Sequence, residues 1–314
     1  MQKLINKYTP KKSTIPVLQF VHVKDNLATI TNLDYWLTLP APCNMQEGLY
    51  SPIGLYEGFP QNAKNTPLSE FPIRDKPDEL ITIQIVSSQK LLDKLQFVAP
   101  AMAKKEEVRY YLKGICFSDT HLVANDGVNM NIAPLGFTLP ADHRPIITAD
   151  AIRLLIDVLK RKDCPATTTI TFNKETTFFN IGDINIFARS IEAAYPDYAR
   201  FIPSLEGRKI TAFSTNEFKA IEKKARMLAK QEGKKQTHIL IKQEGIYYGD
   251  TLLAPCSLDV GENVEKFNLD AILKATSGKA FYEPRHTLYV QGCGGWVSIL
   301  IPMLPYKTYR VQGD

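Results

Sequence analysis

The chain has 314 residues, of which 44% are hydrophobic and 23% charged, and its formal net charge at pH 7 is +5. These values, with a mean hydropathy of −0.17, are those of an ordinary soluble protein with room for two or three domains. No apolar run approaches the ~18 residues that span a bilayer, and the start carries no apolar segment of signal-peptide length. The five scattered cysteines indicate reduced thiols, so we expect a cytoplasmic protein.

The first part of the chain predicts few regular elements. We expect a short helix over residues 1–8 and a β-hairpin whose strands alternate within 17–31. Ser51 followed by Pro52 resembles the start of a helix that runs toward Phe59. Four prolines interrupt residues 60–77, which therefore read as a linker.

The middle of the chain predicts a longer series of elements. We expect a strand over 80–86, then a helix capped by Ser87 or Ser88 with leucines on its inner face. A hairpin over 110–124 follows, and Thr148 opens a second helix. Its apolar residues recur at i, i+3, i+4 and i+7, as expected of a helix with one buried face. Further strands are expected at 169–172, 176–180 and 185–190.

The last part repeats this layout. After a strand near Lys209, Ser214 or Thr215 caps a helix that ends at Gly233. A hairpin over 238–248 precedes a last helix capped by Asn268. Closing strands are expected at 288–290 and 296–301.

A strand, a basic helix, a hairpin, a second basic helix and a hairpin thus occur over about 79–191 and again over about 209–303. The period is roughly 120 residues, and a shortened version lies at the start of the chain. Such repetition indicates a string of similar domains. Because the repeated helices carry Lys and Arg on one face, we expect a long polyanion, most obviously nucleic acid, as the partner.

The basic residues of these helices are the candidate contacts to nucleic acid. Phosphate contacts from flexible cationic side chains bind DNA without reading its sequence. The alternative is that charged helix faces serve solubility. The candidates are Lys3, Lys7, Lys90, Lys94, Arg153, Lys160, Lys219, Lys223, Arg226, Lys230 and Lys274.

Motifs of catalysis are lacking. Residues 292–295 are glycine-rich but have no Lys-Ser/Thr of a P-loop, so they predict a hairpin turn. The cysteines and histidines show no metal-binding spacing, and Asp126-Gly127 is first of all a turn. We therefore expect no cofactor, no metal and no enzymatic activity.

Four local motifs occur in register with the repeat. They are Val108–Gly114 before a strand, Ala124–Gly127 after the next, Ala188–Pro203 at the end of the middle unit, and Ile301–Met303. In this order and spacing they resemble the bacterial sliding clamp, the beta subunit of DNA polymerase III. The resemblance covers nearly the whole chain and is strongest in the middle.

The resemblance implies an α+β DNA clamp fold, in which each repeated domain packs two helices on antiparallel β-sheets. It also implies a homodimeric ring that encircles double-stranded DNA and slides with the polymerase. The expected domains are 1–77, a truncated first domain with its linker, then 78–206, and 207–314 with a C-terminal tail. Partner proteins, such as polymerase and clamp loader, would dock short peptides in an apolar cleft between the second and third domains.

The resemblance also carries over site residues. Arg109, Tyr110 and Tyr111 match positions close to DNA, although packing within a strand is the alternative for the two tyrosines. A cleft that buries two or three apolar side chains, at about 1.5–3 kcal/mol each, predicts micromolar-range binding. Plain core packing is the alternative for residues 301–303. The matching cleft residues are Leu112, Asn125, Gly127, Val128, Asn129, Met130, Pro203, Lys224, Ala225, Leu300, Ile301, Pro302 and Met303.

The chain departs from the family pattern at three places. The first unit begins at its helix and lacks several later strands, which bears on ring closure and favours a phage or mobile-element origin. Val128-Asn129 stands where the family often has a polar or basic pair, and residues 304–314 extend past the usual end. One alternative is a monomeric clamp-like adaptor that binds polymerase or clamp-loader peptides without encircling DNA. Another is a DNA-processing enzyme on a similar scaffold.

Overall fold

A computed structural model gives the architecture of the chain. It describes residues 1–42, 45–57, 68–74, 82–105, 108–140, 143–173, 175–204, 206–207, 209–260, 264–283 and 287–301. The linker prolines 60, 67 and 77, the residues Pro302 and Met303, and the tail 304–314 lie outside the described residues.

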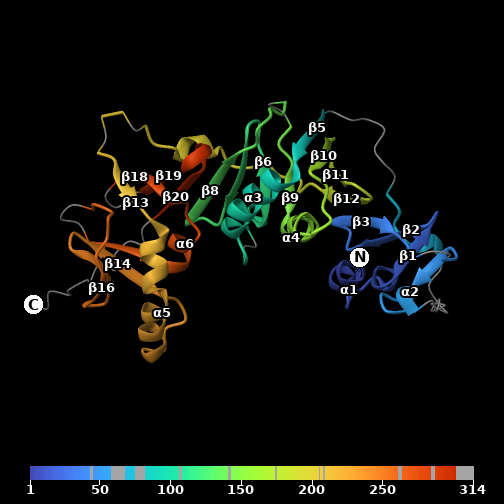
Figure 1. The fold of residues 1–314 in the computed structure, drawn as a ribbon, viewed down its shortest axis with the longest axis horizontal. Helices are drawn as coiled ribbons and strands as arrows, with labels where there is room; N and C mark the ends of the chain where they lie inside the picture. Colours follow the sequence, from blue (N-terminus) through green and yellow to red (C-terminus); the bar gives the residue numbers. More distant parts are fainter. Residues whose placement is uncertain are drawn as a thin grey trace, which may run out of the picture. The chain divides into compact units, whose positions relative to one another are not determined.

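The elements follow the repeat, and we call residues 1–77, 78–206 and 207–314 the first, second and third modules (Figure 1). The first contains α1 (Gln2–Tyr8), β1 (Val21–Lys24), β2 (Leu27–Thr31), β3 (Tyr35–Pro40), β4 (Gly48–Tyr50) and α2 (Gly54–Glu57). The second contains β5 (Thr82–Ser87), α3 (Ser88–Val98), β6 (Gly114–Phe117), β7 (His121–Asn125), β8 (Asn129–Pro134), β9 (Ile146–Thr148), α4 (Ala149–Leu159), β10 (Thr167–Phe172), β11 (Thr176–Ile181) and β12 (Ile184–Arg189). The third contains β13 (Thr211–Phe213), α5 (Thr215–Gln231), β14 (His238–Lys242), β15 (Gly245–Tyr248), β16 (Thr251–Ala254), β17 (Glu265–Asn268), α6 (Leu269–Leu273), β18 (Gly278–Glu283), β19 (Thr287–Gln291) and β20 (Val297–Leu300).

The chain forms two compact units whose boundaries differ from those of the modules. Unit 1 comprises residues 1–99, 105–122 and 135–195, and unit 2 comprises 100–104, 123–134 and 196–314. The division passes through the second module, because strands of one module pair with strands of the next. Each unit therefore contains a junction between two modules.

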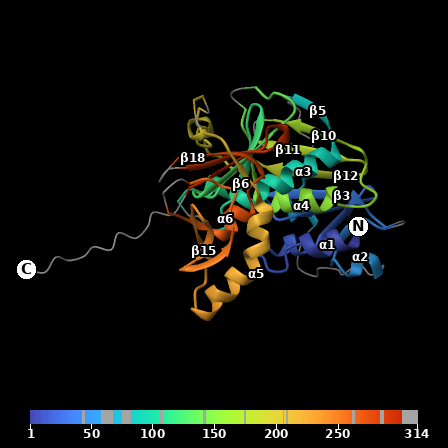
Figure 2. The ribbon, with the colours of Figure 1, turned by 60° about the vertical axis from the view of Figure 1, so that its left-hand side comes forward.

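Unit 1 is built on an antiparallel sheet with the order β4-β1-β2-β3-β12-β11-β10-β5. The first module supplies the first four strands and the second module the others, and they meet where β3 pairs with β12. Helix α4 packs against both α1 and α3 (Figures 1 and 2). The Thr148 hydroxyl accepts a hydrogen bond from the Ala151 N–H and caps α4, as its sequence predicts.

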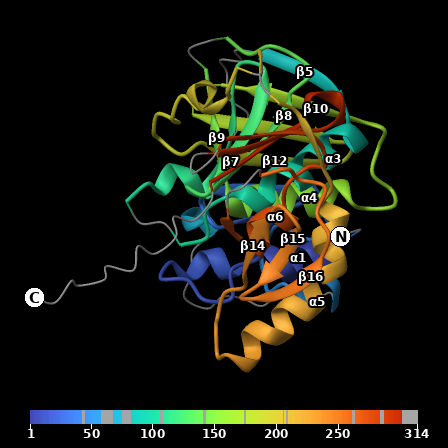
Figure 3. The ribbon, with the colours of Figure 1, turned by 90° about the vertical axis from the view of Figure 1, so that its left-hand side faces the viewer.

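Unit 2 contains two antiparallel arrangements of strands. One has the order β13-β18-β19-β20-β8, and the other, from the third module alone, has the order β16-β15-β14-β17. Helices α5 and α6 pack on each other beside these strands (Figure 3). Phe218, Ile272 and Leu300 are fully buried in one hydrophobic cluster between the helices and strands.

The three modules share one local order of strands. The strands β1 to β4 of the first module correspond to β14 to β17 of the third. In both sheets, the third of these four strands in chain order lies at one end of the group of four. That third strand is β3 in the first module, and β12 of the next module covers it. Its counterpart β8 is covered by β20. The counterpart in the third module, β16, has no strand on its outer edge within the described residues.

Two sequence-based boundaries were wrong. The strand expected from Tyr110 begins at Gly114, and Tyr110–Lys113 form a 3-10 turn. Gly114 stands where the neighbouring strand approaches closely, because a Cβ at this position would lie 2.5 Å from the Ile147 carbonyl oxygen. Residues Pro16–Gln19 form a 3-10 turn instead of the start of a strand, with Pro16 at its first position.

In the part of the chain that the structure describes, no helix is both long and apolar enough to cross a membrane. The described side chains also bring together no group of three or more His, Cys, Asp and Glu that could hold a metal ion.

Candidate functional site

The turn between β7 and β8 in unit 2 is held by its own side chains. The Asn125 side-chain oxygen accepts from the Gly127 N–H at 2.6 Å. The Asp126 carboxylate accepts from the N–H groups of Val128 and Asn129, at 3.0 and 2.8 Å. Gly127 has a φ of +88°, which a residue with a side chain rarely adopts. The turn therefore presents Val128 in a fixed position.

The end of β20 lies directly opposite this turn. Asn129 pairs with Leu300, and the Ile301 N–H donates to the Val128 carbonyl at 2.9 Å. The side chains of Val128 and Ile301 thus occupy neighbouring positions on one face of the sheet, and they are 42% and 44% exposed. Met130 and Ile299 extend the same face beneath them and are buried. We call Val128 and Ile301 the apolar pair.

The opposite face of these strands is buried and polar. The Ser298 hydroxyl donates to the Asn131 side-chain oxygen at 2.8 Å, and the Asn131 amide donates to the Lys274 carbonyl at 3.0 Å. The Thr276 N–H in turn donates to the Ser298 hydroxyl at 2.9 Å. These bonds join the segment after α6 to the strands that carry the apolar pair. The neighbouring Asn129 is 1% exposed, and its amide has no hydrogen-bond partner among the described residues.

The other predicted cleft residues have varied surroundings. Ala225 is fully buried in the core of unit 2, whereas Lys224, the residue before it on α5, is exposed. Pro203 is partly buried and follows two exposed apolar residues, Phe201 and Ile202. Leu112 is buried in unit 1. Pro302 and Met303 lie outside the described residues.

In unit 1 the candidate DNA contacts on α1 differ in their pairing. Lys3 and Lys7 are exposed, and Lys7 forms an ion pair with Asp157 of α4. The Tyr8 hydroxyl donates to the same carboxylate at 2.7 Å. Burial works to raise the pKa of Asp157, but these hydrogen bonds and the Lys7 charge outweigh it and lower the pKa. The Asp157 carboxylate therefore joins α1 to α4.

Two of the four candidate DNA contacts on α3 and α4 are bonded to other groups of the protein. The Lys94 ammonium group donates to the Leu135 carbonyl at 2.8 Å, and burial, with a contribution from Lys90, lowers its pKa. Arg153 pairs with Asp150 at 2.6 Å. Lys90 and Lys160 are exposed.

On α5 the basic stripe contains one residue with two acidic partners. Arg226 lies 2.8 Å from Glu222 and 2.6 Å from Asp270 at the start of α6. The hydrogen bonds to Asp270 and Glu222 raise the pKa of this guanidinium. Lys219, Lys223 and Lys230 are exposed on the same helix. Outside the helix stripe, the Lys274 ammonium lies 3.7 Å from Asp126, at the turn that carries Val128.

The residues Arg109, Tyr110 and Tyr111 lie in the 3-10 segment before β6. The Tyr110 hydroxyl donates to the Glu192 carbonyl at 3.1 Å, and its ring meets the ring of Tyr111 edge-on at 6.2 Å. Tyr110 is 48% exposed, and Arg109 is exposed as well. Tyr111 is partly buried and contacts the ring of Tyr195 at 6.4 Å.

Sequence reasoning did not identify the residues that hold these side chains. Asp157 and Asp270 neutralise basic candidates on other helices, and Asn131 with Ser298 supports the apolar pair. Their partners lie 44 to 167 positions away in the sequence. A possible signal was the pair of asparagines at alternate positions of β8, which a buried strand carries only when hydrogen bonds satisfy them.

Comparison with known proteins gives a consistent result. No family model matches the chain. The Beta sliding clamp of Escherichia coli K12 is 27% identical over 154 residues, which are 46% of this chain and 40% of that protein. The Beta sliding clamp of Salmonella typhimurium matches to the same extent. The match thus spans two fifths of the length of these curated relatives.

Solved structures extend the likeness at the level of fold. The beta sliding clamp of C. crescentus has a TM-score of 0.74 at 20% identity, over 96% of this chain and 95% of that one. The DNA polymerase III beta subunit of Thermotoga maritima has a TM-score of 0.74 at 18% identity, with the same coverage. That of Pseudomonas aeruginosa has a TM-score of 0.75 at 16% identity, over 96% of both chains.

The chain therefore has the α+β fold of a DNA sliding clamp, as the sequence predicts. Its resemblance to the beta subunit of DNA polymerase III is confirmed by the curated relatives and by the solved structures.

Proposed function

We propose that this protein is a DNA sliding clamp, a processivity factor that encircles duplex DNA and tethers a polymerase to it. The agreement in fold with DNA polymerase III beta subunits along 96% of the chain carries the proposal. As in those relatives, the protein would hold DNA and partner proteins without performing chemistry. Its compartment would be the cytoplasm, where DNA replication takes place in bacteria.

The exposed cations of α1, α3, α4 and α5 support DNA as a partner. Lys3 and Lys90 in unit 1, and Lys219 and Lys223 in unit 2, are exposed and form no ion pair within the described residues. Lys160 is exposed as well and lies near Asp157. Flexible lysines that contact phosphates weakly would allow the clamp to slide, and such contacts weaken steeply with salt. The neutralised Arg226 and the engaged Lys94 would contribute less.

The apolar pair supports peptide docking. Two neighbouring aliphatic side chains, each more than two fifths exposed on a hydrogen-bonded backbone, can bury apolar side chains of a partner. Each buried side chain would contribute about 1.5–3 kcal/mol before ordering costs. This predicts the weak, exchangeable binding that a shared docking site needs.

Loading on circular DNA tests the encircling function. The full chain, a bacterial clamp loader and ATP are incubated with nicked circular DNA, and bound protein is separated by gel filtration. A closed ring stays on circular DNA at high salt and is lost after a single restriction cut, because it slides off the ends. Equal retention on cut and uncut DNA would contradict encirclement.

One observation bears on the choice between a ring and the alternative of a monomeric adaptor. The outer edge of β16 carries no strand within the described residues, and its Leu252 is 48% exposed. A ring would need a second copy to cover this edge. Sedimentation velocity at micromolar concentration distinguishes the two functions, since a dimer has twice the 35.4 kDa of one chain. A strict monomer that still binds partner peptides would establish the adaptor.

A further inference from the structure

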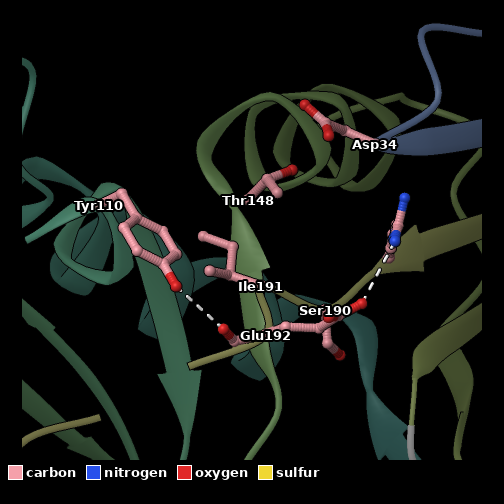
Figure 4. A pocket seen from close by; sticks show the side chains of 7 residues that line it. Asp34, Tyr110, Thr148, Ser190, Ile191 and Glu192 are labelled. Carbon is pink, nitrogen blue, oxygen red and sulfur yellow. Dashed lines mark hydrogen bonds and ion pairs between the residues drawn. The ribbon is translucent and has the colours of Figure 1, made fainter. Parts of the chain in front are cut away.

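A polar pocket of about 340 Å³ opens on unit 1 at the junction between β3 and β12. Figure 4 shows Asp34 and Tyr110 at opposite sides of this pocket, with Thr148 and Ile191 between them. Arg189, Ser190 and Glu192, from the end of β12 and the residues after it, complete the lining. Of its lining residues, Tyr110 alone is also a predicted DNA contact, and the peptide docking proposed above does not use this pocket.

The pocket occupies the same place in unit 1 as the apolar pair in unit 2. The Arg189 N–H donates to the Asp34 carbonyl at 2.8 Å, as the Ile301 N–H donates to the Val128 carbonyl at 2.9 Å. The neighbouring pair of residues across the two strands is buried in both units. It is Ala188 with Tyr35 in unit 1 and Leu300 with Asn129 in unit 2. Asp34 therefore corresponds to Val128, and Arg189 to Ile301.

Of the carboxylates in and beside the pocket, that of Asp34 forms no ion pair within the described residues. Arg189 forms an ion pair with Glu192 at 3.3 Å, and the neighbouring Asp150 pairs with Arg153 at 2.6 Å. The Asp34 side chain has no hydrogen bond or ion pair among the described residues, although it is exposed in the pocket. Partial burial of the carboxyl group raises the pKa of Asp34, the Asp150 charge adds to the rise, and Arg189 opposes it. A second cation at this carboxylate would be stabilised.

The other walls suit a side chain with an aliphatic stem and a cationic end. Ile191 offers an apolar surface between Tyr110 and Asp34 (Figure 4). Ser190 is part of the wall as well, but its hydroxyl oxygen is itself buried, so the Asp34 carboxylate is the acceptor that a ligand in the pocket would meet. Tyr110 is held against the Glu192 carbonyl at 3.1 Å, which keeps the far wall in place.

We propose that this pocket is a second docking site, which takes a lysine or arginine side chain of a partner peptide through Asp34. Its place in the module, equivalent to that of the apolar pair, rests on the proposed docking function, but its ligand chemistry is its own. One clamp chain would then distinguish two kinds of peptide, apolar at the second junction and basic at the first.

Two blocked probe peptides test the proposal on the full chain: Ac-Gly-Leu-Lys-Leu-Gly-amide and the same peptide with norleucine in place of lysine. Binding is measured by NMR titration of labelled protein. We expect the lysine probe to bind about fivefold more tightly than the norleucine probe, the size of one accessible ion pair. Asp34→Asn should remove this preference, and Asp34→Lys should transfer it to a glutamate probe.

The matched control is Asp183→Asn, which removes an exposed carboxylate in another turn of unit 1. It should not alter the preference for lysine, and all variants should keep the wild-type melting temperature. Equal binding of both probes, an equal loss of preference in Asp183→Asn, or a stronger response of pocket residues to inorganic phosphate would each overturn the proposal. Ile301→Asp, assayed with an apolar peptide, separately tests docking at the apolar pair, so the two hypotheses fail independently.

Discussion

The two module junctions of this protein share a backbone and differ in side-chain chemistry. β12 covers β3 in unit 1 and β20 covers β8 in unit 2, each ending in an equivalent N–H to carbonyl bond of 2.8–2.9 Å. At that bond, unit 1 carries Asp34 and Arg189, whereas unit 2 carries Val128 and Ile301. The strand ladder thus fixes where two side chains meet, and the residues placed there decide what the surface can bind.

The junctions also differ beneath the surface. The buried ladder pair is Ala188 with Tyr35 in unit 1 and Leu300 with Asn129 in unit 2. The Tyr35 hydroxyl reaches the Tyr8 carbonyl at 2.6 Å and so ties β3 to α1. In unit 2 Leu300 joins the core between α5, α6 and the strands. The Tyr35 bond thus anchors β3 within the first module, whereas at the second junction Leu300 packs in the core and Ser298 bonds to Asn131 across the two strands.

The largest effect should come from Leu300→Ala, which gives the second junction the residue of the first. Leu300 is fully buried, so the substitution removes apolar contacts and leaves a cavity. We expect the free energy of unfolding to fall by about 2–5 kcal/mol, measured by urea denaturation. The control is Ile301→Ala, one position along, where partial exposure predicts a loss below about 1 kcal/mol. Equal losses would show that the second junction does not depend on buried packing.

The next largest effect should come from changing the exposed side chains of the second junction while its core stays unchanged. The double variant Val128→Asp/Ile301→Arg gives the second junction the side chains of the first. Both positions are exposed, so stability should change little, while docking of a short leucine- and phenylalanine-containing peptide should weaken roughly tenfold or more. Fluorescence anisotropy of the labelled peptide measures this. Unchanged affinity would place the docking surface elsewhere.

Part of this comparison could be predicted from the sequence. Thr148 and Asn268 cap their helices as expected, since a capping side chain acts on residues two or three positions away. The glycine-rich residues 292–295 form the predicted turn, with Gly294 and Gly295 at positive φ. Chemistry that acts within a few residues is visible in a single sequence.

The remainder depends on contacts between distant segments. β8 was not predicted. Asn129 to Ile132 alternate polar and apolar residues as an exposed strand would, yet both faces of this strand are buried, and contacts with distant segments satisfy Asn131. The pocket of unit 1 is lined by residues that lie between Asp34 and Glu192 in the sequence, and no local motif marks them. Lys274 was assigned to an outward helix face, and its proximity to Asp126 could not be read from the sequence.

A smaller effect is expected where helices are joined by charge in each unit. Asp157 links α4 to Lys7 and Tyr8 of α1, and its pKa is lowered in the folded protein. Its contribution to stability is therefore present above the unfolded pKa of about 3.9 and is lost as the pH falls through the lower folded value. Asp157→Asn should lower the melting temperature at pH 7 and have little further effect at pH 2, by differential scanning calorimetry.

The corresponding change in unit 2 is Asp270→Asn, which removes one of two partners of Arg226. Because this ion pair is about half exposed, the loss of stability at pH 7 should be smaller than that of Asp157→Asn. A larger loss in unit 2 would reverse the ranking of the two charge links.

The smallest effect should separate free from neutralised cations on α5. Lys223 is exposed, whereas Arg226 on the same helix lies between Glu222 and Asp270. If α5 faces DNA, Lys223→Ala should reduce the slope of log affinity against log salt by about 1, the effect of one lost phosphate contact. Arg226→Ala should reduce it less, because its acidic neighbours already balance its charge and would then repel phosphate. Titration of labelled duplex DNA over a range of salt measures both slopes. An equal or larger change for Arg226→Ala would mean that its guanidinium leaves the two carboxylates when DNA binds, and the ion pairs of α5 would then act as a reserve of positive charge.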